Sequence, residues 1–285
     1  MGFAQARSAI ERLQTLERGD ARIASEGYTR LLDHGAQTER AIICFHGFTN
    51  CPEQFAELGR RFHAKGDTVY IPRLPHHGYS DRRTRALAAL THRDLQLAAV
   101  EAVILGASLG RRVHVVGLSL GGLLAAWTGQ MLEVASTIAI APLLSLAFPS
   151  WLNAAFPGLI RTLPDIYLWW DPLRRAASSR TPPYAYPGFP SRALGAQLGL
   201  RDELVRRMRD EKPRTTFAAL ILNDRDNVIN NTVAHALFRC WQQAGASVVE
   251  LQLSDLHAHH DIIDPWHRHL PLERIYGSIE ALVPA

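Results

Sequence analysis

The residues best suited to chemistry lie in one short turn, residues 117–121, which read Gly-Leu-Ser-Leu-Gly and are followed by Gly122. This is the G-x-S-x-G pattern of a tight strand-to-helix turn that leaves a serine hydroxyl free to act as a nucleophile. Residues 113–116, Val-His-Val-Val, favour a buried strand, and residues 123–127, Leu-Leu-Ala-Ala-Trp, favour a helix. The pattern alone recurs by chance, but strand, glycine-rich turn and helix together favour a nucleophile at Ser119 over a passenger serine.

A serine hydroxyl is a weak nucleophile unless a base takes its proton and a third group holds that base. Histidine is the usual base. The late segment 256–264 carries three candidates, His257, His259 and His260. Histidine more often has a structural role, so at most one of the three is expected to be the base.

The third group is expected in the turn after a late strand, residues 216–222. Residues 223–228, Asn-Asp-Arg-Asp-Asn-Val, offer two carboxylates there, Asp224 and Asp226. Either could orient a histidine, and the other could cap the turn by accepting hydrogen bonds from nearby backbone.

A metal site is the competing interpretation of the histidine-rich segment. Residues 257–261 nearly match the zinc-binding run H-x-H-x-D-H, in which two histidines and an aspartate are ligands. Ile262 stands where the final histidine of that run belongs, and no other ligand cluster is evident in the sequence. The serine interpretation is therefore favoured, and neither a metal ion nor an organic cofactor is expected.

The elements that must position these residues alternate between strand and helix. Strands are expected at residues 27–32, 40–45, 68–71, 113–116, 136–141, 216–222 and 247–253. Helices are expected at the N-terminus and at residues 52–64, 91–105, 123 onward, 232–245 and 272–283. This alternation predicts an α/β protein with a mostly parallel, doubly wound sheet.

A stretch of different composition interrupts the alternation. Ten of the 16 prolines lie between Pro142 and Pro213, together with many large aromatic residues. A long irregular segment inside a compact domain is usually functional. We therefore expect an inserted cap of short helices at residues 143–214, and a core domain made of residues 1–142 and 215–285.

The large aromatic side chains of the cap must be buried somewhere. An insertion between two strands lies over the carboxyl ends of the sheet, where open α/β sheets bind ligands. Trp151, Trp169 and Trp170 are accordingly expected to line an apolar acyl pocket above Ser119. The alternative is a small core inside the cap itself.

Taken together, these features resemble the α/β-hydrolase family, over roughly residues 31–283. Four matches carry the resemblance: the His-Gly-Phe-Thr run at residues 46–49, the Pro-to-Gly loop at residues 72–78, the Ser119 turn, and a late acid followed by a late histidine. Within the family, the His-Gly-Phe-Thr loop resembles that of bacterial carboxylesterases and monoacylglycerol lipases.

The resemblance implies a role for each candidate. Ser119 would be the nucleophile, His260 the base, because it precedes a short apolar segment, and Asp226 the acid, because an apolar residue follows two positions later. The backbone N–H groups of Phe48 and Leu120 would form the oxyanion hole. The loop at residues 46–47 would be shaped by its histidine and glycine, and the one at residues 76–78 would support the site structurally.

Composition limits the other function classes. The 285-residue chain is 47% hydrophobic and carries a formal net charge of +4, from arginines scattered among acidic residues. The sequence has no basic stripe, so nucleic-acid binding is not expected. The cysteines, three in number and widely spaced, suggest neither disulfides nor zinc. Residues 1–19 form an amphipathic pattern and no run is long enough to span a bilayer, so a cytoplasmic protein without integral membrane association is expected.

The sequence therefore predicts a serine hydrolase that cleaves small-molecule carboxylic esters, with short-to-medium acyl chains, through an acyl-enzyme. A serine at position 119 argues against dehalogenases and epoxide hydrolases, which need an acidic nucleophile. Thioesters and amides use the same machinery and remain open, as does a non-catalytic binding protein on a hydrolase fold.

Overall fold

The computed structural model describes residues 1–147, 160, 164–171, 181–257 and 259–284. Its centre is a seven-stranded sheet in the order β1-β3-β2-β4-β5-β8-β9, in which β1 is antiparallel to β3 and all other neighbours are parallel. The strands are β1 (Arg30–Leu32), β2 (Thr38–Phe45), β3 (Thr68–Ile71), β4 (Gly110–Leu118), β5 (Ser136–Ile140), β8 (Phe217–Asn223) and β9 (Ser247–Leu253).

The central strands are apolar because helices cover both faces of the sheet. Ile43 of β2 pairs with Val115 of β4 on one side and with Tyr70 of β3 on the other, and all three side chains are buried. Parallel strands buried in this way read as continuous apolar runs rather than as an alternating pattern. This explains why the positions of these strands expected from the sequence agree with the observed ones.

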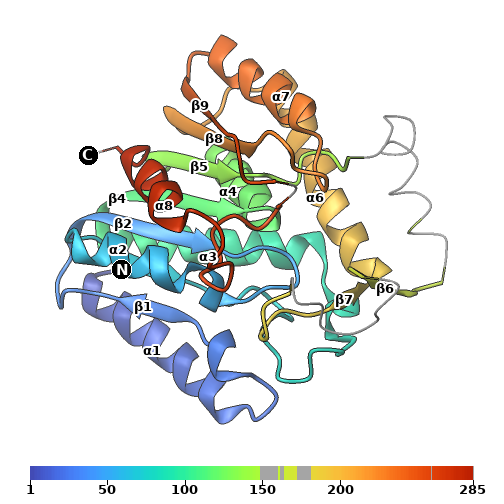
Figure 1. Cartoon of the computed structure of the whole chain (residues 1–285). Helices are drawn as coiled ribbons and strands as arrows, with labels where there is room; N and C mark the ends of the chain where they lie inside the picture. The colour runs from blue at the N-terminus through green and yellow to red at the C-terminus, as the bar shows by residue number, and fades with distance from the viewer. Residues whose placement is uncertain (148–159, 161–163, 172–180, 258, 285) are drawn as a thin grey trace.

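Helices pack on both faces (Figure 1), with α2 and α8 in front of the sheet and α3 and α4 behind it. Arg61 of α2 forms an ion pair with Glu280 of α8, which joins the two front helices. On the other face, α6 packs against α3, α4 and α7, and α1 packs against α3. The helices are α1 (Phe3–Gly19), α2 (Ala56–Ala64), α3 (His92–Leu109), α4 (Leu120–Met131), α6 (Ser191–Asp210), α7 (Asn231–Gln243) and α8 (Leu272–Ala281).

The described part of the connection between β5 and β8 contains more than the short helices expected for it. It holds a two-stranded antiparallel sheet, β6 (Tyr167–Trp169) with β7 (Gly188–Pro190), and the 20-residue helix α6. The division of the chain into a core and a cap at residues 143–214 stays a prediction. Within the described part of the chain, no helix is both long and apolar enough to cross a membrane.

Candidate active site

Ser119 lies between β4 and α4 in a strained backbone conformation. Its φ of 58° and ψ of −112° place a non-glycine residue in the left-handed half of φ space, which costs on the order of 1–3 kcal/mol. The turn is fixed by backbone hydrogen bonds: Ser119 N–H donates to the Ile140 carbonyl at 2.9 Å, and the Ser119 carbonyl accepts from Leu123 and Leu143. Such overdetermined strain is common at catalytic residues.

The glycines of the turn allow helix and strand to approach closely. A Cβ on Gly121 would lie 1.8 Å from the Phe45 carbonyl oxygen, and a Cβ on Gly117 would lie 2.0 Å from the Gly121 carbonyl oxygen. Neither position has room for any side chain. The sequence pattern around Ser119 therefore has a steric cause in this fold.

Asp226 and His260 are brought together by the ends of neighbouring strands, β8 and β9. His260 Nδ1 donates to Asp226 Oδ2 at 2.7 Å, and the Asp226 side chain is fully buried. Asp226 Oδ1 accepts from the N–H groups of Val228 and Ile229 at 2.8 and 3.3 Å. These contacts hold the carboxylate in place and fix the tautomer of the histidine, which leaves Nε2 as a proton acceptor.

His260 Nε2 is buried and has no hydrogen-bond partner among the described residues. A buried nitrogen without a partner is costly in free energy, and at a strand end it is a candidate contact for a ligand. Ser119, Asp226 and His260 follow β4, β8 and β9, three parallel strands of one sheet. All three therefore lie at the same carboxyl edge, where α/β sheets bind ligands.

The other candidates from the sequence lie differently. Asp224 is exposed, and its N–H donates to the Leu253 carbonyl at the end of the sheet. His257 is also exposed, while His259 Nε2 lies 2.8 Å from His269 Nε2. Of these acids and histidines, Asp226 and His260 are the two that the structure pairs with each other.

The two residues expected to form the oxyanion hole, Phe48 and Leu120, belong to different segments. Leu120 is the first residue of α4, so its N–H has no acceptor within the helix. Phe48 lies in the loop after β2, whose shape depends on His46: Nε2 of that ring accepts from the Leu74 N–H at 3.1 Å, and Nδ1 donates to the Gly47 carbonyl. Burial lowers the pKa of His46 to about 4, so the ring is neutral.

Most of the sequence matches one known family. A model described as the alpha/beta hydrolase family matches residues 42–271. The chain belongs to that family. It is therefore assigned to the enzymes of the α/β-hydrolase superfamily, and the mostly parallel, doubly wound sheet predicted from the sequence is confirmed.

Solved structures share the fold of this α/β hydrolase. The structure reported for LipS and LipT, two metagenome-derived lipolytic enzymes, gives a TM-score of 0.69 at 21% identity, covering 91% of this chain and 100% of that one. The monoacylglycerol lipase of Paleococcus ferrophilus gives 0.64 at 17% identity, covering 90% and 98%. A soluble variant of monoglyceride lipase from Saccharomyces cerevisiae gives 0.63 at 12%, covering 89% and 90%. No curated protein matches the sequence. At these identities, the likeness establishes the fold alone.

The structure of this α/β hydrolase adds a residue that the sequence did not single out, Gln54. Its Oε1 accepts from the Gly47 N–H at 2.7 Å, and its Nε2 donates to Asp261 Oδ2, also at 2.7 Å. Gln54 is buried, and it links the loop that carries Phe48 to the residue after His260. No local sequence signal marks this role, because Gln54 and Asp261 are 207 positions apart.

Asp261 lies in a buried polar cluster with a second carboxylate. Burial and the neighbouring Asp264 raise the pKa of Asp261 above its ordinary value. Asn50 Nδ2 donates to both carboxylates, and Tyr184 donates its hydroxyl to Asp264. The cluster fixes the start of the loop that follows His260.

The tryptophans expected to line an acyl pocket are separated by the structure. Trp170 donates from Nε1 to Thr49 Oγ1 at 3.0 Å, and its ring packs against Phe48 and Phe189. Trp169 instead contacts Tyr167, 4.9 Å between ring centroids, and the guanidinium of Arg83. The third, Trp151, lies outside the described residues.

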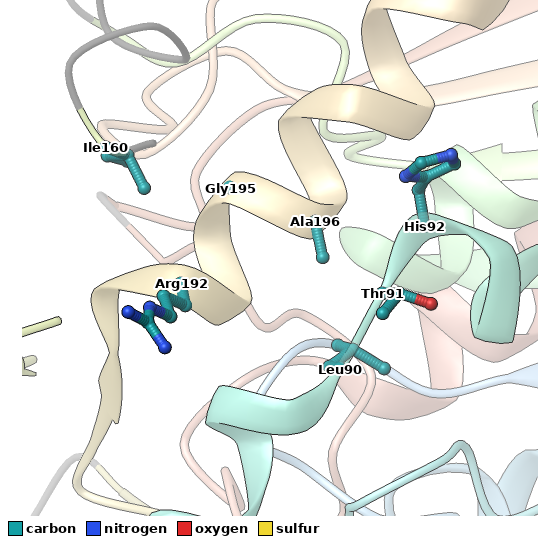
Figure 2. A pocket seen from close by; sticks show the side chains of 7 residues that line it. All are labelled: Leu90, Thr91, His92, Ile160, Arg192, Gly195 and Ala196. Atoms are coloured by element: carbon teal, nitrogen blue, oxygen red, sulfur yellow. The ribbon is translucent and has the colours of Figure 1, made fainter. Parts of the chain in front are cut away.

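A hollow of about 370 Å³ lies elsewhere, between the start of α3 and the start of α6 (Figure 2). Its described lining comprises Leu90, Thr91, His92, Ile160, Arg192, Gly195 and Ala196. Because none of the candidate active-site residues is part of that described lining, we do not assign the substrate to this hollow.

The described residues that could hold a metal ion overlap only in part with those of the H-x-H-x-D-H interpretation. The group whose ligand atoms converge is His259 with His267 and His269. The run at residues 257–261 thus contributes one member of that group, and the other members come from the loop before α8.

Proposed function

We propose that this α/β hydrolase is a serine hydrolase of carboxylic esters. The observation that carries the proposal is the His260–Asp226 hydrogen bond. It leaves a buried Nε2, without a partner among the described residues, at the sheet edge that also presents the strained Ser119. A nucleophile, a base and a group that orients the base are the parts that acyl transfer requires.

In the proposed mechanism, Ser119 Oγ attacks the ester carbonyl while its proton passes to His260 Nε2. The Asp226 carboxylate stabilises the imidazolium that forms. The N–H groups of Phe48 and Leu120 donate to the oxyanion of the tetrahedral intermediate. The intermediate collapses to an acyl-enzyme, and the alcohol leaves with the proton from the imidazolium.

A water molecule completes the cycle. His260 takes a proton from the water, whose oxygen attacks the acyl-enzyme, and a second tetrahedral intermediate forms in the same oxyanion hole. Its collapse breaks the bond to Ser119, which regains its proton from the imidazolium. The products are a carboxylic acid and an alcohol.

The ester class is supported by the apolar surroundings of the oxyanion loop. The rings of Phe48, Trp170 and Phe189 pack together beside it and form an apolar wall. Apolar walls favour hydrocarbon acyl chains, because burial removes each methylene from water. The solved structures that share the fold include lipolytic enzymes and a monoacylglycerol lipase, which agrees with an ester as the substrate.

The test is a comparison of wild type with Ser119→Ala on p-nitrophenyl esters and on a fluorophosphonate probe. We expect Ser119→Ala to lose about 10³-fold or more in kcat and all labelling, because triad members act as one unit. Ser8→Ala, which removes an exposed hydroxyl from α1, is the matched control and should behave as wild type.

The alternatives make different predictions in the same experiment. A variant that keeps more than about a tenth of the wild-type kcat contradicts the assignment of Ser119. A wild type that neither turns over esters nor reacts with the probe supports a non-catalytic binding protein. If matched thioesters or amides are turned over faster than esters, the faster class is the preferred substrate. A thioesterase domain from the curacin biosynthetic pathway shares this fold, at a TM-score of 0.53.

A further inference from the structure

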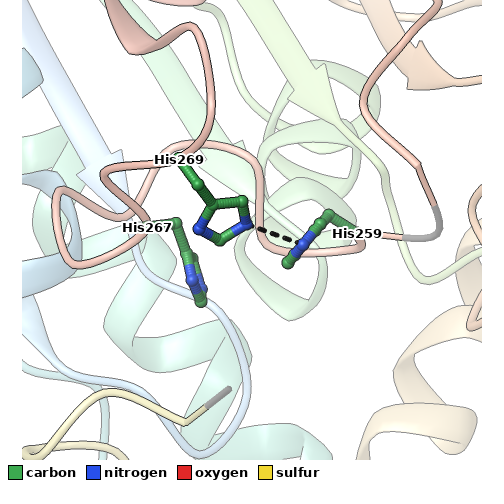
Figure 3. A group of neighbouring side chains, drawn as sticks. All are labelled: His259, His267 and His269. Carbon is green, nitrogen blue, oxygen red and sulfur yellow. Dashed lines mark hydrogen bonds between the residues drawn. The ribbon is translucent and has the colours of Figure 1, made fainter. Parts of the chain in front are cut away.

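Three histidine side chains lie close together, one of them directly before His260 in the sequence (Figure 3). His259 follows β9, while His267 and His269 belong to the loop before α8. One ring nitrogen from each lies within 4.8 Å of the other two. Each pair of rings is also in contact, with centroids 4.6, 5.5 and 5.8 Å apart.

A hydrogen bond between two of the three rings explains only part of this arrangement. His259 Nε2 and His269 Nε2 lie 2.8 Å apart, which is a hydrogen bond between two imidazoles. The third ring, His267, is 4% exposed and adds a further nitrogen to the same space. Three basic side chains repel one another when protonated, so such a group is unusual unless it binds a cation through its lone pairs.

The spacing suits a metal ion coordinated by nitrogen. In tetrahedral zinc sites with Zn–N bonds of about 2.0–2.1 Å, the ligand nitrogens lie about 3.3–3.4 Å apart. Here the three nitrogens lie within 4.8 Å of one another, so small side-chain rotations bring them to that separation. Imidazole favours zinc and neighbouring transition metals, whereas magnesium and calcium prefer oxygen ligands.

The backbone that carries the three rings is held by hydrogen bonds of its own. Asn223 Nδ2 donates to the His259 carbonyl at 2.7 Å. The His267 N–H donates to the Asp264 carbonyl at 3.0 Å, and the His267 carbonyl accepts from Leu270. The site is therefore largely formed before an ion arrives, which lowers the cost of ordering the ligands.

We propose that His259, His267 and His269 bind a divalent transition-metal ion, with zinc the expected occupant and a fourth position open to water. Because His259 directly precedes His260, a bound ion ties the segment that carries the proposed base to the loop before α8. The ion thereby restricts the movement of that segment. Its binding does not depend on the proposed ester hydrolysis.

The test uses the full-length protein, without a histidine tag and stripped of metal with a chelator. Co²⁺ titration should give the visible absorption of a tetrahedral cobalt site at one ion per chain, and Zn²⁺ should displace it. Zn²⁺ should also raise the Tm, because an ion that binds only the folded state stabilises it. His269→Ala, at an exposed position, should weaken Zn²⁺ binding by at least about 10-fold and abolish the Tm shift.

The matched control removes a histidine from another close pair. The rings of His34 and His63 stack with centroids 4.0 Å apart, far from the three histidines in the sequence, and His34 is exposed. His34→Ala should leave the affinity and the Tm shift unchanged. His269→Gln repeats the test at the same position with a side chain that keeps much of the volume.

Three results overturn the proposal. The first is a wild type that binds neither Co²⁺ nor Zn²⁺ at micromolar concentration. The second is a Zn²⁺ affinity that both His269 variants leave unchanged, which indicates adventitious surface binding. The third is an equal loss of affinity in His34→Ala.

Discussion

The carboxylate of Asp226 accepts three hydrogen bonds, two from backbone N–H groups and one from His260. An amide at this position presents an N–H₂ group and so permits the wrong tautomer of the histidine, with its proton on Nε2. Asp226→Asn should therefore lower kcat by about 10³–10⁴-fold while the fold persists. The measurement is steady-state kinetics on one p-nitrophenyl ester.

The neighbouring acid supplies the control for that prediction. Asp224 is exposed and lies on the same turn, so Asp224→Asn removes the same charge from the surface. It should keep kcat within about twofold of wild type. If Asp224→Asn lost more activity than Asp226→Asn, the acid would be Asp224.

Gln54 links the oxyanion loop to the residue after His260, which makes it a positioning residue in the proposed mechanism. Gln54→Met keeps the volume but leaves the Gly47 N–H and the Asp261 carboxylate without this partner. We expect kcat to fall about 10-fold or more with KM little changed, because the oxyanion hole acts on the transition state.

Loss of two buried hydrogen bonds also costs about 1–3 kcal/mol of stability, so the prediction needs a control for stability. Gln130 is an equally buried glutamine far along the chain, where it accepts from Trp241 Nε1 at 2.7 Å. Gln130→Met should lower the free energy of unfolding by a similar amount and leave kcat unchanged. Equal kcat losses in both variants would mean that Gln54 is only structural.

The residues that could be read from the sequence are those whose signal is local. Ser119 stands in a pattern whose glycines have a steric cause within a few positions. Its proposed partners are expected in turns after late strands, and the structure pairs Asp226 with His260 there. Gln54 and the group of three histidines could not be predicted, because their contacts join segments that only the fold brings together.

At the scale of elements, the two tryptophans at the end of β6 have different surroundings: Trp169 is its last residue and Trp170 follows it. Trp170 packs beside Phe48, while Trp169 contacts Arg83. If Trp170 lines the acyl pocket, kcat/KM should rise from acetate toward medium chains, each buried methylene contributing up to about 0.8 kcal/mol. Trp170→Ala should reduce this gain, and Trp169→Ala should not.

The measurement is kcat/KM for p-nitrophenyl esters from acetate to decanoate in the three proteins. Chain-length dependence isolates the pocket, because acetate and decanoate share every step at the carbonyl group. A steady decline from acetate onward in wild type would contradict an acyl pocket at this wall. Equal changes in Trp170→Ala and Trp169→Ala would show that Trp170 does not line the acyl pocket.

Helix α6, 20 residues long, is not among the helices expected individually from the sequence, although its residues carry a helical pattern. Leu200, Leu204 and Met208, which are four positions apart, are buried on one side of it, and the helix packs against α3, α4 and α7. Composition alone assigns it to a proline-rich insertion, because the prolines before it and the one at position 213 dominate that part of the chain. The buried parallel strands are predicted well because short continuous apolar runs bounded by turn residues are typical of such strands.

At the scale of the whole molecule, buried neutral histidines make the fold sensitive to acid. Burial lowers the pKa of His46 to about 4, and burial, with Arg40 and Arg112 nearby, does the same for His114. The unfolded chain takes up these protons at pH ~6.5. Between these values the unfolded state binds more protons, so the free energy of unfolding falls as the pH falls, by up to about 3 kcal/mol per histidine.

Urea unfolding at pH 7, 6 and 5 measures this effect. His114→Gln keeps a partner for Ser136, which bonds to the ring at 2.8 Å, and removes the titrating group. Its stability should fall less between pH 7 and 5 than that of wild type. His92→Gln, at an exposed position, should follow the wild-type curve, and a His114→Gln curve parallel to wild type would contradict the prediction.

The long connection after β5 leaves the sheet at the carboxyl edge and returns to the opposite edge, because β5 and β8 are parallel neighbours. β5 pairs directly with β8, and the N–H of Ala141 donates to the Ile221 carbonyl at 2.8 Å. Among the described residues of that connection, none joins the central sheet, and its last part, α6, is anchored to the core helices. Helix α6 thus makes the crossing back toward β8, which leaves the stretch between Ala141 and Ser191 as the part whose length can vary. A foreign segment of different length could be grafted there, and the scaffold could acquire a new substrate range without rebuilding its chemistry.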